Sequence, residues 1–434
     1  MIGSLREVLL VSPDRVAPKM AGPGIRYVEL GRVLGSVHDV TLAAPLGSQS
    51  IEGGPAVELY DPDRPGALRR LFSPGQVVVT PPLAPDVLRG VTADDRTWIV
   101  DLYNAEPFEG LAQQRPRGVR EGFRDLARVD RLAFAARTGA AFVCASERQR
   151  DMWLGFLAAS RRLDSTNYSR DPELRTLIDV VPFGLPSLLP ERQGEGLRGT
   201  VFPQSARIMV WNGGLWDWFD PETVLAALVR LREQDASWCL AFSGTGRPSH
   251  RSGMGTSERV LRLVDELGLR RQGTVHVREW TPYAERAGPL LDADMGVSAH
   301  HLSLEARFAH RARMLDLVWT RTPILCTAGD EWSEVVVAEG LGVAVPPGDA
   351  DALAEGASLI AARGRASYAP AFDAAASLRT WDVVAAPLFG LLEAATARPQ
   401  RRPDLVGRCL ALRHSAASAV QRTARYSRAR LARE

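Results

Sequence analysis

The stretch HHLSLEARFAHRARMLDLVW, residues 300–319, places two carboxylates among three guanidinium groups. The acids are Glu305 and Asp316, and the arginines are Arg307, Arg311 and Arg313. Arginine meets phosphate oxygens with a fork of N–H donors, and a carboxylate accepts hydrogen bonds from hydroxyl groups. Together these residues suit one elongated anionic ligand, with its charge met by Arg311 or Arg313 and its two ends held by the carboxylates.

The distance between the two acids depends on where the helix in this stretch begins. In one continuous helix Glu305 and Asp316 share a face but lie roughly 16 Å apart along the axis, too far to grip one small group. A helix that begins near Ala309 leaves Glu305 in the preceding loop, turns its free amides toward a bound phosphate and places Asp316 about two turns in. The competing interpretation is a solvated helix in which Arg313 pairs with Asp316 at a spacing of three residues.

The first loop of the chain, SPDRVAPKMAGPGIRYVELGRVL, is a second candidate for binding. A strand ends there at Ser12, and a helix begins near Gly24 to Arg26. Glycine lets a ligand approach the backbone, and free amides at a helix start favour a phosphate or a polar hydroxyl group. The alternative is a loop that only needs backbone angles accessible to glycine.

A related loop opens the second half of the chain, in IMVWNGGLWDWFDPETVLAALVRL. There a strand meets Gly213 and Gly214, and a helix starts after Asp220, a residue type that caps helix N-termini, with proline at the first helical position. Tryptophans accompany the glycines in this segment, and they are interpreted either as core packing or as a platform for a sugar. They are Trp211, Trp216 and Trp218.

These loops lie between short apolar runs that alternate with helical patterns, which is typical of parallel strands joined by crossover helices. The runs form two series, separated by a segment rich in proline and glycine near Ser187 to Ser205. The first series is EVLLVS, DVTLAAP, QVVVTPP, TWIVDLY and AAFVCAS, and the second is ARIMVWNGG, WCLAFSG, TVHVREW, DMGVSAH, TPILCT and GVAVPP. The sequence therefore predicts an α/β protein of two doubly wound Rossmann-like domains that face a cleft, with ligands at the carboxyl ends of the strands. The predicted ranges are 1–190 for the first domain, 205–375 for the second, 376–397 for a helix that returns to the first domain, and 398–434 for a basic tail.

Composition excludes several classes of protein. The 434 residues exceed one ordinary core, and the formal net charge of +2 gives no polyelectrolyte character that would indicate a nucleic-acid partner. The cysteines are far apart without a Cys-x-x-Cys pair, so neither disulfides nor a zinc site is expected. The start of the chain is typical of a buried strand, and no apolar run reaches about 18 residues, so the sequence predicts a cytoplasmic protein. The four cysteines are Cys144, Cys239, Cys326 and Cys409.

The tail from residue 398 onward contains ten arginines against Asp404 and Glu434. Leu405, Cys409 and Leu412 fall at helical spacing within it. This pattern favours an amphipathic basic helix on anionic lipid, with peripheral contact at the inner membrane face; the alternative is an appendage without such a role.

Several of these stretches, in this order, resemble the large family-four type of GT-B retaining glycosyltransferases. The resemblance rests on KMAGPGIRYVEL, VCASERQRDMWLG, VVPFGLP, WNGGLWDWFDP, HHLSLEARFAHRARMLDLVWTRTPIL and EGLGVAVPPGDADAL. It extends from near the N-terminus to about residue 355. It implies the GT-B architecture, a nucleotide-diphosphate sugar as donor, an acceptor hydroxyl on a sugar or a lipid-linked molecule, no cofactor and no obligatory metal.

The resemblance also implies roles for particular residues. The family carries two glutamates separated by seven residues, one at the donor sugar and one at the ribose; the counterparts here are Glu305 and Asp316, with three more residues between them and a shorter second acid. The family's Arg and Lys pair after the first strand of the second domain is absent from WNGGLWDWFDP. The candidates for the diphosphate are therefore Arg311, Arg313, Arg26, Gly24 and the Gly213–Gly214 amides, and Asp101 at the end of TWIVDLYNAEP either positions the acceptor or caps its strand.

Three functions remain open on the sequence. The first is a retaining glycosyltransferase that acts in the synthesis of cell-surface polysaccharide, glycolipid or a glycosylated metabolite. The second is a sugar-nucleotide-binding pseudo-enzyme, which the altered acidic spacing and the missing basic pair favour. The third, a nucleotide-sugar 2-epimerase of the same architecture, calls for more histidine and acid in the cleft than the sequence offers.

Overall fold

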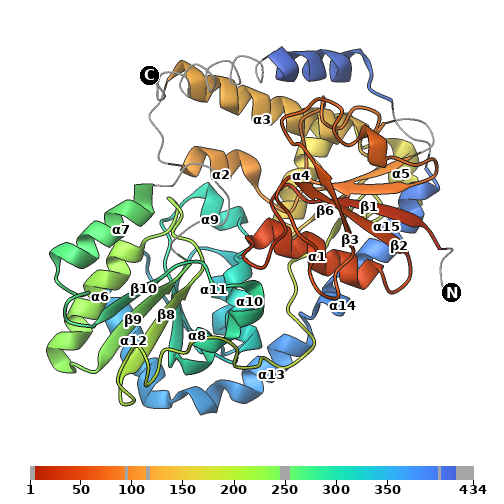
Figure 1. The fold of residues 1–434 in the computed structure, drawn as a ribbon. Coiled ribbons are helices and arrows are strands. Elements are labelled where there is room, and N and C mark those ends of the chain that lie inside the picture. The colour runs from red at the N-terminus through yellow and green to blue at the C-terminus, as the bar shows by residue number, and fades with distance from the viewer. Residues whose placement is uncertain (1–4, 93–95, 114–117, 245–254, 399–401, 417–434) are drawn as a thin grey trace.

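The structure, a computed structural model, describes residues 5–92, 96–113, 118–244, 255–398 and 402–416. The chain forms two α/β domains, each built on a parallel sheet with helices on its faces (Figure 1). The predicted fold class of two doubly wound domains is therefore confirmed.

The sheet of the first domain has the strand order β3-β2-β1-β4-β5-β6-β7. Its inner strands are continuous apolar runs, such as VVVT in β4, and they are buried on both faces, as parallel strands between two helical layers must be. The edge strand β3 is largely exposed. The strands are β1 (Glu7–Val11), β2 (Asp39–Pro45), β3 (Ala56–Tyr60), β4 (Val77–Thr80), β5 (Thr97–Asp101), β6 (Ala141–Cys144) and β7 (Ile178–Val180).

Helices cover both faces of this sheet (Figure 1). The first begins at Gly22, two residues before the predicted start, with Pro23 in its first turn. The helices are α1 (Gly22–Leu34), α2 (Glu106–Ala112), α3 (Val119–Thr138), α4 (Glu147–Ala159), α5 (Ser165–Arg170) and the 3-10 turn η1 (Arg69–Leu71).

The sheet of the second domain has the order β10-β9-β8-β11-β12-β13, in which the direction of winding reverses between β8 and β11. Ligands of such sheets bind in the crevice at this reversal, outside the carboxyl ends of the strands. The strands are β8 (Arg207–Asn212), β9 (Trp238–Ser243), β10 (Val275–Arg278), β11 (Met295–Ser298), β12 (Ile324–Thr327) and β13 (Gly342–Val345).

The helices of the second domain include the one predicted after Asp220. The Asp220 carboxylate accepts a hydrogen bond from the Thr223 amide at 3.1 Å, and Pro221 is the first helical residue. The helices are α6 (Pro221–Gln234), α7 (Gly255–Glu266), α8 (Ala287–Asp292), α9 (Leu304–Phe308), α10 (Ala312–Trp319), α11 (Glu331–Ala338), α12 (Ala350–Arg363) and α13 (Ala369–Ser377), with the 3-10 turns η2 (Tyr283–Glu285) and η3 (Arg365–Tyr368).

After α13 the chain returns to the first domain through α14 (Trp381–Val384) and α15 (Ala386–Thr396). The segment that follows β7 packs against the start of this returning segment. Leu185 exchanges backbone hydrogen bonds with Arg379 and Trp381 at 2.9 and 3.0 Å, and the Phe183 ring lies 4.7 Å from the Trp381 ring. Helix α15 then packs against β5, β6 and β7. The chain therefore crosses between the domains twice, and the two crossings support each other.

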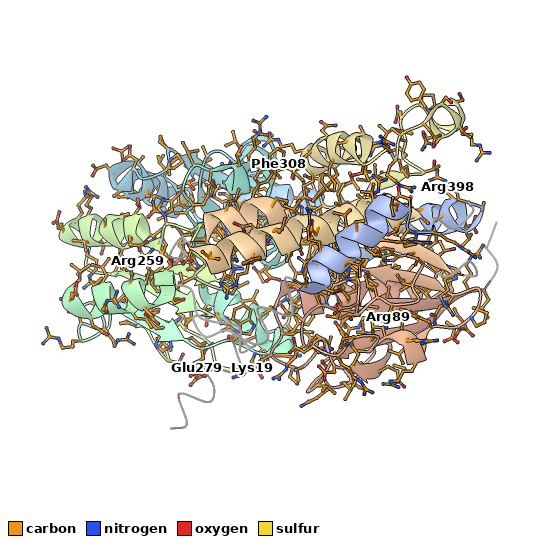
Figure 2. All side chains as sticks on the ribbon, turned by 90° about the horizontal axis from the view of Figure 1, so that it is seen from above. Lys19, Arg89, Arg259, Glu279, Phe308 and Arg398 are labelled. Carbon is orange, nitrogen blue, oxygen red and sulfur yellow. The ribbon has the colours of Figure 1, made fainter. Side chains whose placement is uncertain are left out.

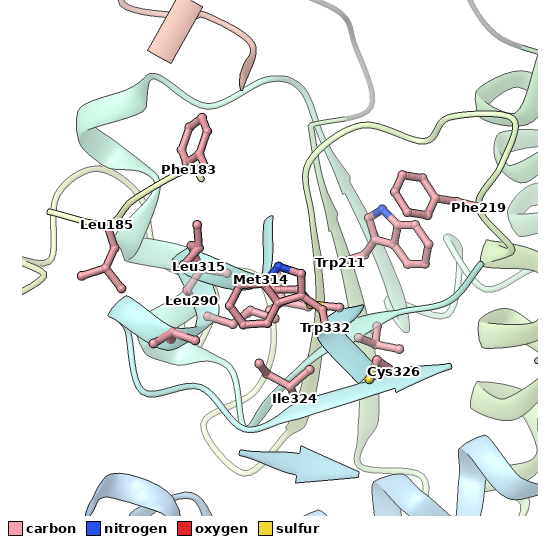
Figure 3. Packing of buried hydrophobic residues seen from close by; sticks show 14 of the residues in the cluster. Phe183, Leu185, Trp211, Phe219, Leu290, Met314, Leu315, Ile324, Cys326 and Trp332 are labelled. Carbon is pink, nitrogen blue, oxygen red and sulfur yellow. The ribbon is translucent and has the colours of Figure 1, made fainter. Parts of the chain in front are cut away.

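A hydrophobic cluster continues from this crossing into the second domain. It contains Phe183 and Leu185 together with the buried residues of α10. Figure 3 shows Met314 and Leu315 of α10 among these buried side chains. One face of α10 is therefore fixed in the core, which orients the residues on its other face.

The basic tail lies partly outside the described residues, because 399–401 and 417–434 are not among them. Residues 405–416 form a helix beside α3. Arg413 Nε donates to the buried Asp130 carboxylate at 2.7 Å, and the buried His414 ring contacts the Ala127 carbonyl at 2.9 Å. In the part of the chain that the structure describes, no helix is long and apolar enough to cross a bilayer.

Candidate functional site

A cavity of about 370 Å³ opens between the two domains. The first domain contributes the β1–α1 loop, the segment after β5 and helix α2, and the second contributes the loops after β8, β9 and β10 together with α9 and α10. The cavity therefore lies over the reversal between β8 and β11, where a ligand of this sheet is expected.

Glu305 lies on the cavity wall, near the start of α9. The Ser303 hydroxyl caps this helix by accepting a hydrogen bond from the Ala306 amide at 3.1 Å. The Glu305 carboxylate accepts two hydrogen bonds from Arg311, each of 2.8 Å, and both side chains are buried. Helix α9 ends at Phe308 and α10 begins at Ala312, so the predicted helix start near Ala309 is wrong by three residues. Glu305 lies on a short helix of its own and not in a loop.

Arg311 is not free to meet a diphosphate. Besides its fork on Glu305, its Nε lies 3.5 Å from the Asp330 carboxylate. Burial lowers the pKa of Arg311, but the charges of Glu305 and Asp330 and their hydrogen bonds outweigh burial and raise it. The geometry thus corrects the expected role of Arg311: it holds Glu305 in one position.

Arg313 is the cation that remains unpaired. Its Nη2 donates to the Gly214 carbonyl at 2.6 Å, and its guanidinium lies over the rings of Phe219 and Trp211, 4.0 and 5.2 Å from their centres. No carboxylate within the described ranges pairs with it, and its buried Nη1 has no hydrogen-bond partner there. Burial and then the charge of Arg311 lower the pKa of Arg313 to about 9, so it stays charged at pH 7. A buried cation without a counter-ion favours an anionic ligand.

The glycines after β8 frame this cation. Gly213 has φ of +93°, a conformation that favours glycine, and a Cβ there would lie 3.5 Å from the Arg313 guanidinium. The Gly213 amide donates to the Ser243 carbonyl at 2.7 Å. This amide is therefore already used in a hydrogen bond to the end of β9 and is not free to bind a phosphate, contrary to the prediction from the sequence. Gly214 lines the cavity as well.

Asp316 lies one turn beyond Arg313 on α10. Its Oδ1 accepts a hydrogen bond from Arg286 Nε at 2.9 Å. The Arg286 guanidinium stacks over the Tyr283 and Trp319 rings, 3.7 and 4.3 Å from their centres, so it is firmly held. About a third of the Asp316 side chain remains exposed, on the wall of the cavity. The competing interpretation, in which Asp316 pairs with Arg313, is not found among the described residues.

Arg26 and Asp101 do not reach the cavity wall. They form a buried ion pair, with Arg26 Nε 2.7 Å and Nη2 3.1 Å from the carboxylate, and Arg26 Nη1 donates to the Pro182 carbonyl at 3.0 Å. Arg26 therefore does not meet a diphosphate. Of the two roles expected for Asp101 the structure favours the strand-end cap, since its Oδ1 accepts a hydrogen bond from the Tyr103 amide at 3.2 Å. The pair supports Tyr103, a cavity residue that lies under the Arg26 guanidinium at 4.5 Å. Gly24 is also absent from the wall, and a Cβ there would meet the Arg15 carbonyl at 2.8 Å.

Glu109 is a cavity residue that the sequence interpretation missed. It lies on α2, which follows β5 and packs against α9 of the other domain. Burial, and then the charges of Glu305 and Glu106, raise the pKa of Glu109 to about 8. Its signal in the sequence is weak: it is one of two acids in NAEPFEGLA, eight residues after the end of a strand.

Unpaired polar atoms gather around the same cavity. At the carboxyl ends of β8 and β9, Asn212 Oδ1 and Ser243 Oγ are buried without a partner among the described residues, and the same holds for Thr281 Oγ1 beyond β10. Trp218 Nε1 and both ring nitrogens of His310 complete the group. Buried polar groups in proteins are nearly always paired, so such a concentration indicates a surface built for a polar ligand.

The tryptophans divide between the two earlier interpretations. Trp211 is fully buried and packs against Phe242 and Phe219. Trp216 and Trp218 line the cavity, and the Trp216 ring lies 6.5 Å from that of Trp280, which also lines it. The cavity therefore has an aromatic wall as well as polar groups.

No protein-family model matches this chain, and no curated protein sequence matches it. Solved structures do. Sucrose-phosphate synthase from Thermosynechococcus elongatus superposes with a TM-score of 0.64 at 15% identity, over 90% of this chain and 99% of that one. The chain has the GT-B fold. WaaG, a glycosyltransferase of lipopolysaccharide biosynthesis, gives 0.58 at 14% identity over 88% and 98% of the two chains. Anabaena HepE in complex with UDP-glucose gives 0.58 at 13% identity over 90% and 100%.

Proposed function

We propose that this protein is a retaining glycosyltransferase that moves a sugar from a nucleotide-diphosphate sugar to an acceptor hydroxyl. The observation that carries the proposal is the unpaired Arg313 guanidinium beside the fixed Glu305 carboxylate, at the crevice of the second sheet. An anion at Arg313 relieves the cost of a buried lone cation, and a carboxylate beside it holds sugar hydroxyls. The likeness to HepE in its UDP-glucose complex supports the same assignment.

In this proposal the donor follows the carboxyl edge of the second sheet. The diphosphate lies at Arg313 and Gly214, the sugar at Glu305, and the nucleoside extends past Asp316 toward Thr281 and the aromatic wall. Arg313 stabilises the charge that develops on the leaving diphosphate, which is the main requirement of such a transfer. The acceptor attacks from the face that the diphosphate leaves, so the configuration at the anomeric carbon is retained.

The acceptor side and the cellular setting are part of the proposal. The acceptor is a sugar or lipid-linked hydroxyl, in the synthesis of cell-surface polysaccharide, glycolipid or a glycosylated metabolite. The protein acts in the cytoplasm, with the tail at residues 398–434 resting on the inner membrane face. The transfer takes its positive charge from Arg313 and not from a metal, so EDTA is expected to leave the rate unchanged; strict dependence on manganese or magnesium would contradict this.

The experiment is a thermal-shift screen against UDP-, GDP-, ADP- and dTDP-sugars, followed by product analysis with the best binder. A donor at a hundred times its Kd stabilises the fold by about 2.7 kcal/mol, which is readily detected. We expect one nucleotide class to stabilise the protein and NMR of the product to show the donor's anomeric configuration. Stabilisation without turnover supports the pseudo-enzyme instead, which is favoured by the single unpaired cation among the described residues of the cavity. No stabilisation by any nucleotide sugar refutes the proposal.

A further inference from the structure

Most charged groups on the cavity wall are paired, but Asp14, Glu109 and Arg313 have no ion-pair partner among the described residues. Glu305 is held by Arg311 and Asp316 by Arg286, both through ion pairs within the second domain. Arg313, on the second domain, has no acid partner among the described residues, and Glu109, on the first, has no cation partner there. The lone cation faces the proposed donor. Both unpaired carboxyl groups come from the opposite domain, the side left for the acceptor. Of the two, Glu109 is the one that feels the charge of Glu305, at the proposed position of the sugar.

Three contacts fix the helix that carries Glu109. At its start, Glu106 forms an ion pair with Arg131 of α3. At the third residue of the helix, the Phe108 ring stacks on the Phe308 ring of α9, with 5.2 Å between the ring centres and 13° between the ring planes. The residue after Glu109 is Gly110, and the Arg128 guanidinium of α3 packs directly against its Cα. A Cβ at this position would overlap with that guanidinium. Glu109 is thus presented to the cavity by a helix that is anchored to both domains.

We propose that Glu109 is the general base of the transfer, the group that accepts the proton of the attacking acceptor hydroxyl. This inference rests on the proposed function. As the acceptor oxygen forms its bond to the anomeric carbon, the bond from that carbon to the diphosphate oxygen breaks. The diphosphate keeps the electron pair beside Arg313, and the hydroxyl proton passes to the Glu109 carboxylate, which later releases it to solvent.

The charged groups around Glu109 set its pKa in the range that a general base requires. Two acids act on Glu109: Glu305 on α9 and Glu106 on its own helix. Two cations offset part of this negative charge: Arg311, and Arg128 of α3, which is itself paired with Asp125 at 2.7 Å. The pKa of about 8 that results leaves roughly a tenth of Glu109 ionised at pH 7 and makes that fraction a stronger base than an ordinary glutamate. Because the carboxylate is the active form, the rate rises with pH through about pH 8, where half of Glu109 is ionised, and levels off roughly one pH unit higher.

The test uses the full chain and the nucleotide sugar that binds best, with water as acceptor, so that no acceptor need be known. We expect Glu109→Gln to bind the donor within about twofold of the native protein, by calorimetry, and to lose a hundredfold or more in hydrolysis together with the rise toward pH 8. Glu58→Gln, at an acid on the exposed edge strand β3 of the same domain, is the control. It keeps the native rate and the native pH profile.

The outcomes separate this inference from the proposed function. If no nucleotide sugar binds, the proposed function fails and this inference with it. If the donor binds and Glu109→Gln hydrolyses it at the native rate with the native pH profile, Glu109 is not the base although the proposed function stands. A native protein that binds the donor and hydrolyses none between pH 6 and 9 also overturns the inference.

Discussion

Two guanidinium groups at the start of α10, those of Arg311 and Arg313, lie in opposite electrostatic surroundings. Arg311 has two carboxylates within 3.5 Å, and Arg313 has none within the described chain. Paired and unpaired buried charges respond differently to substitution, since removing one partner of a pair strands the other. The two arginines therefore give different predictions although they are two positions apart.

Replacing Arg313 by methionine is expected to weaken donor binding without destabilising the fold. Methionine keeps the packing over Phe219 and removes a cation that has no carboxylate partner among the described residues; only its hydrogen bond to the Gly214 carbonyl is lost. Loss of a charge-assisted contact to phosphate costs about 1.5–3 kcal/mol, roughly a ten- to hundredfold rise in Kd. Calorimetry measures the binding, and the melting temperature reports on the fold. Arg307→Met, an exposed position on α9, is the control and should change neither.

Replacing Glu305 by alanine is expected to destabilise the protein as well as abolish activity. The sequence alone predicts a ligand contact whose loss leaves the fold intact, but the structure shows a buried ion pair. Stranding Arg311 costs about 3–5 kcal/mol, partly offset here by Asp330. Urea unfolding of Glu305→Ala, and of Glu305→Ala with Arg311→Met, tests this. Stability that is no better in the double variant than in the single would count against the ion pair.

The sequence identified the residues on the cavity wall better than their partners. Glu305, Arg313, Asp316 and Gly214 line the cavity, because all follow strands at the carboxyl edge of the sheet. Asp101 also lies at the end of a strand, but its carboxylate forms an ion pair with Arg26, which is 75 positions away. The spacing of residues in the sequence does not indicate so distant a partner. The raised pKa of Glu109 likewise depends on burial and on the charges of Glu305 on α9 and Glu106 on its own helix.

At the scale of elements, continuous apolar runs predicted eleven of the strands, because parallel strands between helical layers must be apolar throughout. The two strands not predicted lie at the two edges of the first sheet: AVELY of β3 is exposed, and β7 has only three residues. The break between α9 and α10 was also missed. There Arg311, which precedes α10, turns back to the Glu305 carboxylate, a tertiary contact that no helical pattern reports.

The helix at residues 405–416 provides a test of the membrane proposal. It docks on α3 through Arg413 and His414, while Leu405 and Leu412 are more than 70% exposed. Figure 2 looks down on this helix and α3, at one outer face of the molecule. The predicted apolar stripe therefore points away from the protein, as contact with a lipid surface requires.

Truncation after residue 397 is expected to leave nucleotide-sugar binding intact and to weaken sedimentation with anionic vesicles. The ten arginines of the tail each contribute up to about 1 kcal/mol near an anionic surface, and this attraction fades as salt rises. Leu405→Ser with Leu412→Ser separates lipid contact from docking, since both side chains face away from α3. Equal sedimentation of all forms at low salt would show that the tail has no part in membrane contact.

At the scale of the molecule, contacts between the domains border the cavity on two sides. On one side Phe308 of α9 stacks on Phe108 and its carbonyl accepts a hydrogen bond from Gln149 at 2.8 Å; Figure 2 marks Phe308 between the two halves. On the other side Trp280 donates to the Met20 carbonyl at 3.0 Å. The cavity in this form is enclosed by both domains. These contacts hold it closed together with the ion pair of Arg148 with Glu334 and the hydrogen bond of the Tyr283 amide to the Pro18 carbonyl.

The Phe108–Phe308 stack is expected to couple closure to donor binding. An aromatic pair contributes about 0.5–1.5 kcal/mol beyond its buried area, so Phe108→Ala or Phe308→Ala should raise the donor Kd by roughly three- to tenfold by favouring separated domains. Because each variant removes the same contact, the double variant should bind little worse than either single one, a coupling near 1 kcal/mol. Calorimetry measures the cycle, and small-angle scattering should show a larger radius of gyration for each variant. Fully additive losses would mean that the rings act separately and that closure does not depend on their contact.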